Sequence, residues 1–309
     1  MRIYIAGIRG MVGSAISREA QLQGHEVFGK PSRLLDLRDR NAVFLELKTM
    51  SPDVLIISAA KVGGILDNSQ FPVEFLTENL QIQTNLLDGA HTAGIEKVVF
   101  LGSSCIYPKY AEQPISESSL LTGMLEPTNE PYAIAKIAGV KLVEAYRKQY
   151  AHNWISIMPT NLYGPNDNFN LGRAHVLPAL LKRFHIAKVK NLPKVEVWGD
   201  GTPLREFLHV SDFAKACMLL LQKYNEDTPI NVGSGEEISI RNLALMIAGT
   251  THFSGEIEFN SDKPNGTPRK LLDSSKLSAI GWRPQVLLTD GIKSTYDWFQ
   301  SQIVEELHS

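Results

Sequence analysis

The feature that most constrains the fold is a glycine-rich turn close to the start of the chain. Gly7, Gly10 and Gly13 follow an apolar run at residues 3–6 and open a helical pattern at residues 12–23. In a strand–turn–helix unit, such glycines permit a tight turn, a close approach of the backbone to a pyrophosphate, and packing of helix on strand. The spacing is G-x-x-G-x-x-G instead of G-x-G-x-x-G. The strand–turn–helix context still predicts a dinucleotide-binding unit.

Apolar runs alternate with amphipathic stretches over the first 160 residues. The runs at 3–6, 26–28, 54–59, 97–101 and 154–158 are predicted strands. The stretches at 12–23, 41–49, 72–93 and 132–150 are predicted helices. This alternation predicts right-handed βαβ units and an α/β fold with a doubly wound parallel sheet of the Rossmann type.

The pattern changes after about residue 164, where Gly and Pro become frequent. We expect shorter strands and helices there, in a second and smaller α/β domain that binds substrate. A helix at 210–222 and a strand at 229–232 are predicted to return to the main sheet. The expected domains are therefore 1–163 with 206–232 for the cofactor, and 164–205 with 233–309 for the substrate.

Charge and cysteine content exclude several classes of protein. Lys and Arg total 31 and Asp and Glu total 33, so the net charge is −2 and a nucleic-acid partner is not expected. Cys105 and Cys217 cannot form a disulfide framework or a four-thiolate zinc site, and no metal is predicted. No apolar run reaches the ~18–20 residues of a membrane helix. We expect a cytoplasmic protein without a membrane partner.

The loop after the second predicted strand indicates which dinucleotide is bound. An NAD enzyme usually places an acidic residue there for the ribose 2′-hydroxyl. Here Lys30, Ser32 and Arg33 follow the strand, the first acidic residue is Asp36, and Arg9 lies within the glycine turn. Cations and a hydroxyl suit a 2′-phosphate, which favours NADP(H). The alternative is that Lys30 and Arg33 are only solvated loop charges.

Three further residues are typical of carbonyl reduction. Tyr132 and Lys136 are four positions apart on a predicted helix, so both side chains lie on one face. An ammonium beside a phenol is expected to lower the phenol pKa towards neutral pH. Ser103 follows the strand at 97–101, at the edge that opens onto the cofactor crevice. Such a serine can hold a substrate oxygen by a hydrogen bond.

With these residues the chain resembles the extended short-chain dehydrogenase/reductase family. Longer segments resemble the GDP-L-fucose synthase family within that group, and they extend over nearly the whole chain. These segments are 9–16, 59–65, 102–108, 130–136, 159–165, 175–180, 197–199, 205–210 and 266–273.

The resemblance implies a reaction in two stages. The substrate would be GDP-4-keto-6-deoxy-D-mannose, a GDP-linked 4-keto-6-deoxy sugar, epimerised at C3 and C5 and then reduced at C4 by NADPH. Tyr132 would be the proton donor for reduction, Lys136 its electrostatic partner, and Ser103 the ligand of the C4 oxygen. Cys105 would be the base and His175 the acid of the epimerisation.

The resemblance also implies binding residues. For the cofactor these are Gly7, Arg9, Gly10, Met11, Val12, Gly13, Ser32, Arg33, Asp36, Leu37, Leu101, Gly102, Ser103, Ser104, Lys136, Pro159, Thr160, Asn161, Leu162 and His175. For the substrate they are Arg183, Trp198, Arg205 and Asn265. The family usually has Asp where this chain has Asn265, so sugar or nucleotide specificity is less secure at that position.

Other functions remain open at the level of sequence. A GDP-L-colitose synthase, which epimerises only C5 of a 3,6-dideoxy-4-keto sugar before reducing C4, needs nearly the same residues. A non-catalytic NADP-binding protein is a remote alternative, because such proteins commonly lose the Tyr or the Lys. In the family, helices corresponding to 72–93 and 132–150 form a dimer interface, so we expect a homodimer.

Overall fold

The computed structural model describes residues 1–263 and 265–308, and its centre is a six-stranded parallel sheet. The strand order is β2-β1-β3-β4-β5-β9. Their bounds are β1 Arg2–Ala6, β2 Glu26–Phe28, β3 Val54–Ile57, β4 Lys97–Leu101, β5 Asn153–Pro159 and β9 Ile230–Val232. The predicted doubly wound parallel sheet is confirmed, and β2 and β4 have the bounds expected from the sequence. The strand predicted at 54–59 ends two residues earlier, at Ile57.

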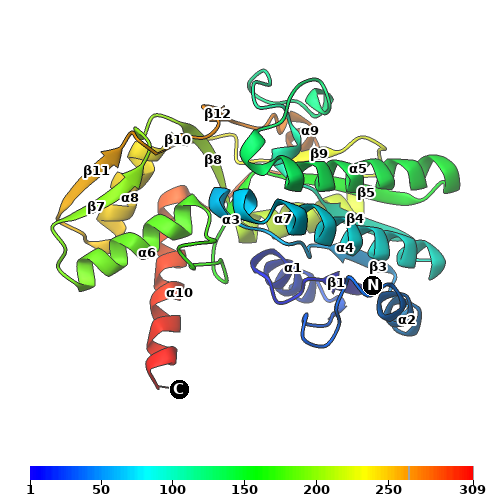
Figure 1. Ribbon diagram of the computed structural model, residues 1–309. Coiled ribbons are helices and arrows are strands. Elements are labelled where there is room, and N and C mark those ends of the chain that lie inside the picture. Colours follow the sequence, from blue (N-terminus) through cyan, green and yellow to red (C-terminus); the bar gives the residue numbers. More distant parts are fainter. Residues whose placement is uncertain (264, 309) are drawn as a thin grey trace.

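Helices cover both faces of this sheet (Figure 1). The helices α1 and α7 pack against each other in one apolar core, and α2, α4 and α5 form the other. Their bounds are α1 Met11–Leu22, α2 Arg40–Met50, α4 Pro72–Thr92, α5 Glu130–Tyr150 and α7 Val210–Lys223, with a short α3 at Ile65–Gln70 that the sequence pattern did not predict. The predicted helix at 210–222 and strand at 229–232 are present as α7 and β9, and β9 pairs with β5 in the main sheet.

A buried contact fixes the position of α5, the helix that carries Tyr132 and Lys136. The Gln83 side-chain amide on α4 donates to the carbonyl oxygen of Ala135 at 2.6 Å. At Gly139 an added Cβ would lie 2.8 Å from Oε1 of the same glutamine and would overlap the Phe100 ring. Glycine therefore lets α5 approach both α4 and β4 closely. This close packing sets where the functional face of α5 points.

The second region is built on two small sheets. One contains β6 Asn161–Tyr163, β8 Leu204–His209, β10 Glu237–Ser239 and β12 Arg269–Lys270, and the other pairs β7 Lys194–Trp198 with β11 Glu256–Asn260. The accompanying helices are α6 Val176–Val189, α8 Ile240–Thr251, α9 Ser275–Ala279 and α10 Leu288–His308. In Figure 1 this region lies beside the main sheet, with α10 extending away from it.

The expectation of uniformly shorter elements in this region was wrong. The helix α10 has 21 residues, as many as α4 or α5. The glycines that suggested interruption lie in turns: Gly199 and Gly201 both have φ of +81° between β7 and β8. Because the strands are short, helices supply much of the local apolar core, including Phe184, Leu243 and Ile292.

The chain passes between the two regions at the carboxyl end of the main sheet. β5 leads through Thr160 into β6, and β6 pairs with β8. The proposed limits of the domains, 1–163 with 206–232 and 164–205 with 233–309, stay a prediction. Across the described residues, no helix combines the length and the apolarity needed to cross a membrane.

Candidate active site

The glycine turn has a geometry that only glycine fits. Gly7 has φ of +90°, and an added Cβ would lie 2.8 Å from the Ala59 amide nitrogen. An added Cβ at Gly13 would overlap the Gly7 carbonyl oxygen. Helix α1 begins at Met11, and Gly10 at its N-cap offers no side chain to the first backbone N–H groups. These groups are therefore available for an anionic ligand, and the turn fits a dinucleotide pyrophosphate.

The loop after β2 presents basic side chains of two kinds. In this loop Ser32 and Arg33 are exposed, and so is Arg9 in the neighbouring glycine turn. These three residues are the ones predicted to bind the 2′-phosphate. Lys30 instead forms an ion pair with the buried carboxylate of Glu46 from α2. Lys30 is therefore a paired charge at the surface, and the assignment of Arg9, Ser32 and Arg33 to a 2′-phosphate stays a prediction.

Asp36, the first acidic residue of this loop, is engaged locally. Its carboxylate accepts from Arg38 at 2.8 Å, and these hydrogen bonds lower its pKa. Leu37 is linked to the adjoining helix, because the Asn85 side chain on α4 donates to its carbonyl oxygen at 3.0 Å. The loop that would hold the adenosine end of a cofactor is thus anchored at Lys30 and at Leu37.

Lys136 is held at the carboxyl end of β4. Its side chain is 4% exposed, and its ammonium donates to the Leu101 carbonyl oxygen at 2.7 Å. The same nitrogen lies 5.0 Å from the centroid of the Phe100 ring and 5.9 Å from that of Tyr132. Burial lowers the pKa of Lys136 to about 8.

Tyr132 keeps its proton at neutral pH. Burial raises the pKa of its phenol, the Cys105 charge acts in the same direction, and a hydrogen bond with Ser103 acts against both. The expected net lowering of this pKa was wrong for the chain without cofactor, because burial outweighs the other effects and the Lys136 ammonium is directed at Leu101. A protonated phenol beside Ser103 is a proton donor, which is the form that carbonyl reduction needs.

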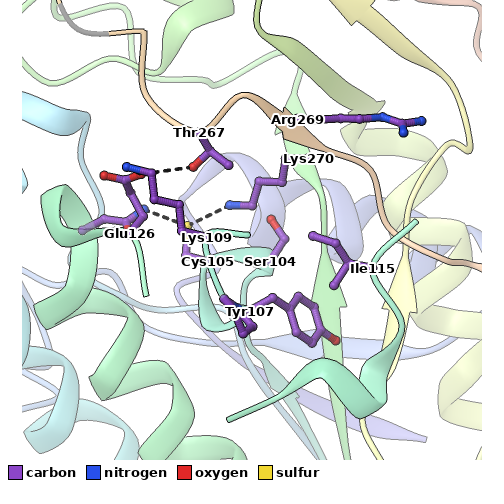
Figure 2. A pocket seen from close by; sticks show the side chains of 11 residues that line it. Ser104, Cys105, Tyr107, Lys109, Ile115, Glu126, Thr267, Arg269 and Lys270 are labelled. Atoms are coloured by element: carbon purple, nitrogen blue, oxygen red, sulfur yellow. Dashed lines mark hydrogen bonds and ion pairs between the residues drawn. The ribbon is translucent and has the colours of Figure 1, made fainter. Parts of the chain in front are cut away.

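Cys105 lies in a polar pocket immediately beyond Ser103. The Ser103 hydroxyl accepts from the Cys105 amide at 3.2 Å and caps a short 3₁₀ helix at Ser104–Ile106. The Cys105 sulfur accepts from the Lys270 ammonium at 3.5 Å (Figure 2). It also accepts from the Asn129 side chain at 3.3 Å. Two donors from distant segments therefore meet at one sulfur atom.

The rim of the pocket is tied together by Glu126. Its carboxylate pairs with Lys109 at 3.0 Å and accepts from the Thr267 hydroxyl at 3.3 Å (Figure 2). These contacts join the segment after β4 to the segment before β12. The residues that line the pocket are Ser104, Cys105, Tyr107, Pro108, Lys109, Ile115, Glu126, Asn129, Thr267, Arg269 and Lys270.

His175 is the N-cap residue of α6, and its surface is exposed. The preceding loop is fixed against α3, because the Gly64 amide donates to the Arg173 carbonyl oxygen at 3.0 Å. The surrounding protein reduces solvation of the His175 ring and so lowers its pKa, and the Lys270 charge adds to this effect. Lys270 therefore acts on both residues of the predicted epimerisation pair.

Three predicted substrate residues, Arg183, Trp198 and Arg205, lie on α6, β7 and β8 of the second region. The Arg183 guanidinium on α6 lies 5.3 Å from the Trp198 ring centroid, and the Lys263 ammonium lies 5.6 Å from the same centroid. Arg205 on β8 is partly buried, and this burial lowers its pKa, while the Glu126 and Cys105 charges oppose that shift. The structure therefore places Arg205 beside Lys270, its register partner on β12, and it places Arg183 beside Trp198.

Asn265 has a structural contact. Its side-chain oxygen accepts from the backbone amide of Asp200 at 3.0 Å, in the turn between β7 and β8. An Asp carboxylate oxygen can make the same contact. The departure from the family pattern at this position therefore preserves this hydrogen bond and removes only a charge.

The remaining cofactor candidates lie at or just beyond the carboxyl ends of β4 and β5, or at the start of β6. Asn161 donates to the Glu206 carbonyl oxygen at 2.8 Å, and Thr160 donates to the same atom at 3.3 Å. At Gly102 an added Cβ would overlap the Met158 side chain. The other members of this group are Leu101, Ser104, Pro159 and Leu162.

Sequence reasoning missed Lys270, Asn129 and Glu126 as site residues. Lys270 lies 165 positions from Cys105, so no local spacing connects the two. The sequence signal for Lys270 was the segment 266–273, which resembles the family, but only the preceding residue, Asn265, was predicted to bind substrate. Among the described residues, no cluster of three or more His, Cys, Asp or Glu residues is arranged to hold a metal ion.

Comparisons with known proteins agree with this geometry. The model of the NAD dependent epimerase/dehydratase family matches residues 3–233. GDP-L-fucose synthase 1 of Arabidopsis thaliana is 53% identical, with 98% of this chain and 94% of that protein covered. GDP-L-colitose synthase of Yersinia pseudotuberculosis is 36% identical, with 98% and 99% covered. The structure of an NADP-bound GDP-L-fucose synthetase from Naegleria fowleri superposes with a TM-score of 0.90 at 28% identity, covering 98% of this chain and 95% of that one.

Proposed function

The chain belongs to the NAD dependent epimerase/dehydratase family, among its GDP-L-fucose synthases, and on this premise we propose the reaction that it catalyses. It epimerises C3 and C5 of GDP-4-keto-6-deoxy-D-mannose and then reduces C4, giving GDP-L-fucose. The observation that carries the proposal is the adjacency of two sets of groups. Ser103, Tyr132 and Lys136 form a reducing set, and Cys105, only two residues beyond Ser103, begins a separate proton-transfer set.

The cofactor is NADPH, which supplies the hydride when bound. The glycine turn and the open N-terminus of α1 fit the pyrophosphate. Arg9, Ser32 and Arg33 are exposed and fit the 2′-phosphate. Lys30 is not included with them, because it is already paired with Glu46. The related synthetase from Naegleria fowleri has NADP bound, which supports this choice.

In the reduction, Tyr132 donates its proton to the C4 oxygen. Its raised pKa keeps the phenol protonated until the oxygen gains negative charge. Ser103 holds the same oxygen by a hydrogen bond and so fixes its direction. Lys136 is anchored at Leu101 and stabilises the phenolate that forms after proton transfer.

In the epimerisation, the C4 ketone acidifies the protons on both neighbouring carbons. Cys105 removes a proton from one face of the sugar, and His175 returns a proton to the opposite face of the enolate. The two groups come from different segments, the turn after β4 and the N-terminus of α6. The base and the acid are therefore separate from Tyr132, which serves the oxygen.

The nucleotide part of the substrate lies against the second region. Arg205 and Arg183 supply planar guanidinium groups for the pyrophosphate oxygens. Trp198 offers a ring face to the substrate, and Asn265 supports the neighbouring turn through Asp200. The fraction of identical residues favours the fucose reaction over the colitose reaction, because the fucose-type relative is 53% identical and the colitose-type relative 36%.

The protein acts as a homodimer in the cytoplasm. Val73 on α4 and Ile134 on α5 are 66% and 44% exposed, on the pair of helices expected to form the interface. Light scattering tests the assembly: a dimer has about twice the chain mass of 34.3 kDa. A mass near that of one chain would contradict it.

Solvent exchange tests the reaction without reduction. With NADP⁺ and the keto sugar in D₂O, deuterium is expected at both C3 and C5 by NMR, and NADPH then converts the sugar to GDP-L-fucose. Exchange at C5 alone would favour the colitose reaction. The Cys105→Ser variant should lose exchange, whereas Cys217→Ala, in the apolar core at 0% exposure, should keep it. Wild-type exchange in Cys105→Ser would refute the assignment of the base.

A further inference from the structure

The two residues of the predicted epimerisation pair come from different regions of the protein. Cys105 follows β4 of the main sheet, whereas His175 begins α6 of the second region. No single element sets their separation, which therefore depends on how the two regions are joined near the site. The short helix α3 lies where the regions meet (Figure 1), and it contacts a segment next to each of the two residues.

On the Cys105 side, α3 packs against the short 3₁₀ helix Pro127–Asn129. The last residue of that helix, Asn129, donates its side-chain amide to the Cys105 sulfur at 3.3 Å. The base of the epimerisation is thus connected to α3 through one intervening side chain.

On the His175 side, α3 is bound by Arg173 in two ways. The Arg173 carbonyl oxygen accepts from the amide of Gly64, the N-cap residue of α3, at 3.0 Å. The Arg173 guanidinium forms an ion pair with the Asp67 carboxylate at 3.6 Å, and the Asp67 side chain is only 12% exposed. Arg173 therefore ties the chain to α3 through both its main chain and its side chain, two positions before His175.

Two glycines allow this close approach. An added Cβ at Gly64 would lie 3.0 Å from the Ala174 carbonyl oxygen, and one at Gly63 would lie 2.7 Å from the Asp67 carboxylate. The Asn68 side chain donates to the carbonyl oxygens of both glycines at 3.0 Å. The start of α3 is therefore held in place, and it lies directly against the backbone that leads to His175.

The His175 ring depends on its backbone for direction. Although His175 is the N-cap residue of α6, its side chain makes no capping hydrogen bond. The amide of Ala179 donates to the His175 carbonyl oxygen at 3.0 Å and joins it to α6. On the other side of His175, the contacts of Arg173 with α3 hold the preceding residues. A change in those contacts would redirect the ring.

We propose that α3 holds His175 in its working position relative to Cys105, with Arg173 and Asp67 as the positioning residues. The proposal rests on the epimerase function argued above. The Arg173 side chain is 63% exposed, so its ion pair contributes little to stability. Misplacing a reacting group by ~1 Å can nevertheless cost about a hundredfold in rate. The contact therefore matters for the outcome of the reaction more than for folding.

Inversion of a carbon needs both groups, whereas exchange with solvent needs only one. Cys105 takes the proton of the C–H bond, and the electron pair of that bond passes into the enolate. If a proton returns from Cys105, the carbon keeps its configuration and has exchanged with solvent. If His175 gives its proton to the opposite face, the carbon is inverted. The ratio of inverted to total deuterated sugar therefore reports whether His175 is in place.

Removing the ion pair should lower this ratio. With NADP⁺ and the keto sugar in D₂O, Arg173→Gln should keep deuterium uptake and lower the inverted fraction about tenfold by NMR. Asp67→Arg alone and Arg173→Asp alone place like charges together, whereas the double variant restores an opposite pair and should recover the ratio. Arg2→Gln is the matched control, because it breaks an ion pair with Glu26 at 3.4 Å, away from the site.

Gly64→Ala tests the same contact without a change of charge. Gly64 has φ of −71° in an extended conformation that alanine adopts readily, so the added methyl group acts only by crowding Ala174. This variant should also lower the inverted fraction. Gly249→Ala, where nothing lies within 4 Å of the added Cβ, should leave it unchanged. Proportional losses of uptake and inversion in Arg173→Gln and Gly64→Ala would indicate a general structural defect and would overturn the proposal.

The His175 ring can also be observed without turnover. In protein carrying isotopically labelled histidine, its NMR signal is assigned from its loss in His175→Gln. That signal should move in Arg173→Gln and in Gly64→Ala, and stay in place in Arg2→Gln and Gly249→Ala. An unmoved signal in both of the first two variants would overturn the proposal. A moved signal in a protein that does not convert the keto sugar would refute the proposed function and leave the positioning by α3 standing.

Discussion

The Tyr107 hydroxyl donates a hydrogen bond to the side-chain oxygen of Asn231 at 2.6 Å, and both groups are buried. Asn231 on β9 is fully enclosed, and its amide donates to the carbonyl oxygens of Ile115 at 2.9 Å and Asp273 at 3.2 Å. One side chain of the main sheet therefore holds the segments that carry Cys105 and Lys270. The pocket depends on this polar anchor as well as on the contacts inside it.

Removing one partner of this contact should destabilise the protein. Tyr107→Phe leaves the Asn231 oxygen buried without its donor, which costs about 1–3 kcal/mol. Tyr110→Phe is the matched control in the same segment, because Tyr110 is 80% exposed and its ring is preserved. Urea unfolding measures both variants. Equal stability of the two would show that the Tyr107 hydroxyl contributes nothing.

Cofactor choice should depend on the two exposed arginines. Replacing Arg9 and Arg33 by Ala should raise the KM for NADPH about ten- to hundredfold, the range of a charge-assisted hydrogen bond, and change that for NADH little. Lys48→Ala, at the last turn of α2, is the control for net charge. Steady-state kinetics with both cofactors gives the comparison. A similar increase for NADH would place the arginines away from the 2′-phosphate.

The sequence predicted the parts of the fold that are determined locally. The bounds of β2 and β4 and the strand–turn–helix unit around Gly7 follow from patterns within a few residues. The pairing of Lys30 with Glu46 and the contact of Lys270 with Cys105 join separate elements, so no periodicity reports them. The short helix α3 was missed because it has only six residues, too few for a helical pattern to be recognised.

The role of Tyr132 also required the structure. A Tyr and a Lys four positions apart indicate one helix face, but they do not show where the ammonium points. Here Lys136 donates to Leu101, and burial dominates the pKa of Tyr132. The spacing predicted the correct residues and the wrong direction of that pKa.

Tyr132→Phe should abolish reduction at C4 while leaving NADPH binding intact, because the phenyl ring packs as before but has no proton to donate. The expected loss in the single-turnover rate is ~10²–10⁴-fold. Tyr150→Phe, at the exposed end of the same helix, is the control and should retain the rate. Deuterium exchange at C3 and C5 should persist in Tyr132→Phe. If that variant reduces C4 at the wild-type rate, Tyr132 is not the proton donor.

The charge of Lys136 should limit activity at high pH. With a pKa of about 8 before cofactor binds, the ammonium loses its proton as pH rises through that value. The kcat/KM for NADPH, which reports the cofactor-free enzyme, should therefore fall above about pH 8. In Lys136→Arg the guanidinium does not titrate in this range, so this limb should disappear. If Lys136→Arg keeps the same fall in kcat/KM at high pH, that fall is caused by a group other than Lys136.

Stability should fall on the acid side because of a pair of histidines remote from the active site. Nδ1 of His91 on α4 lies 2.9 Å from Nε2 of His152, and the His152 ring stacks on Trp154 at 4.4 Å. Such a hydrogen bond needs one ring to accept, so both rings cannot carry two protons while it persists. Burial lowers the pKa of His152, and the neighbouring His91 adds to this shift.

The sign of the effect follows from where the protons bind. The unfolded chain protonates His152 near its ordinary pKa of about 6.5, whereas the folded chain resists protonation until lower pH. The contribution to stability is therefore present above about pH 6.5 and is lost as pH falls through the folded-state value. His152→Phe keeps a ring on Trp154 but cannot titrate, so its Tm should fall less between pH 7.5 and 5.5 than that of the unmutated protein. His252→Asn, at the exposed left-handed C-cap of α8 with φ of +56°, should leave the difference unchanged. A loss of Tm in His152→Phe equal to that of the unmutated protein would show that acid sensitivity arises elsewhere.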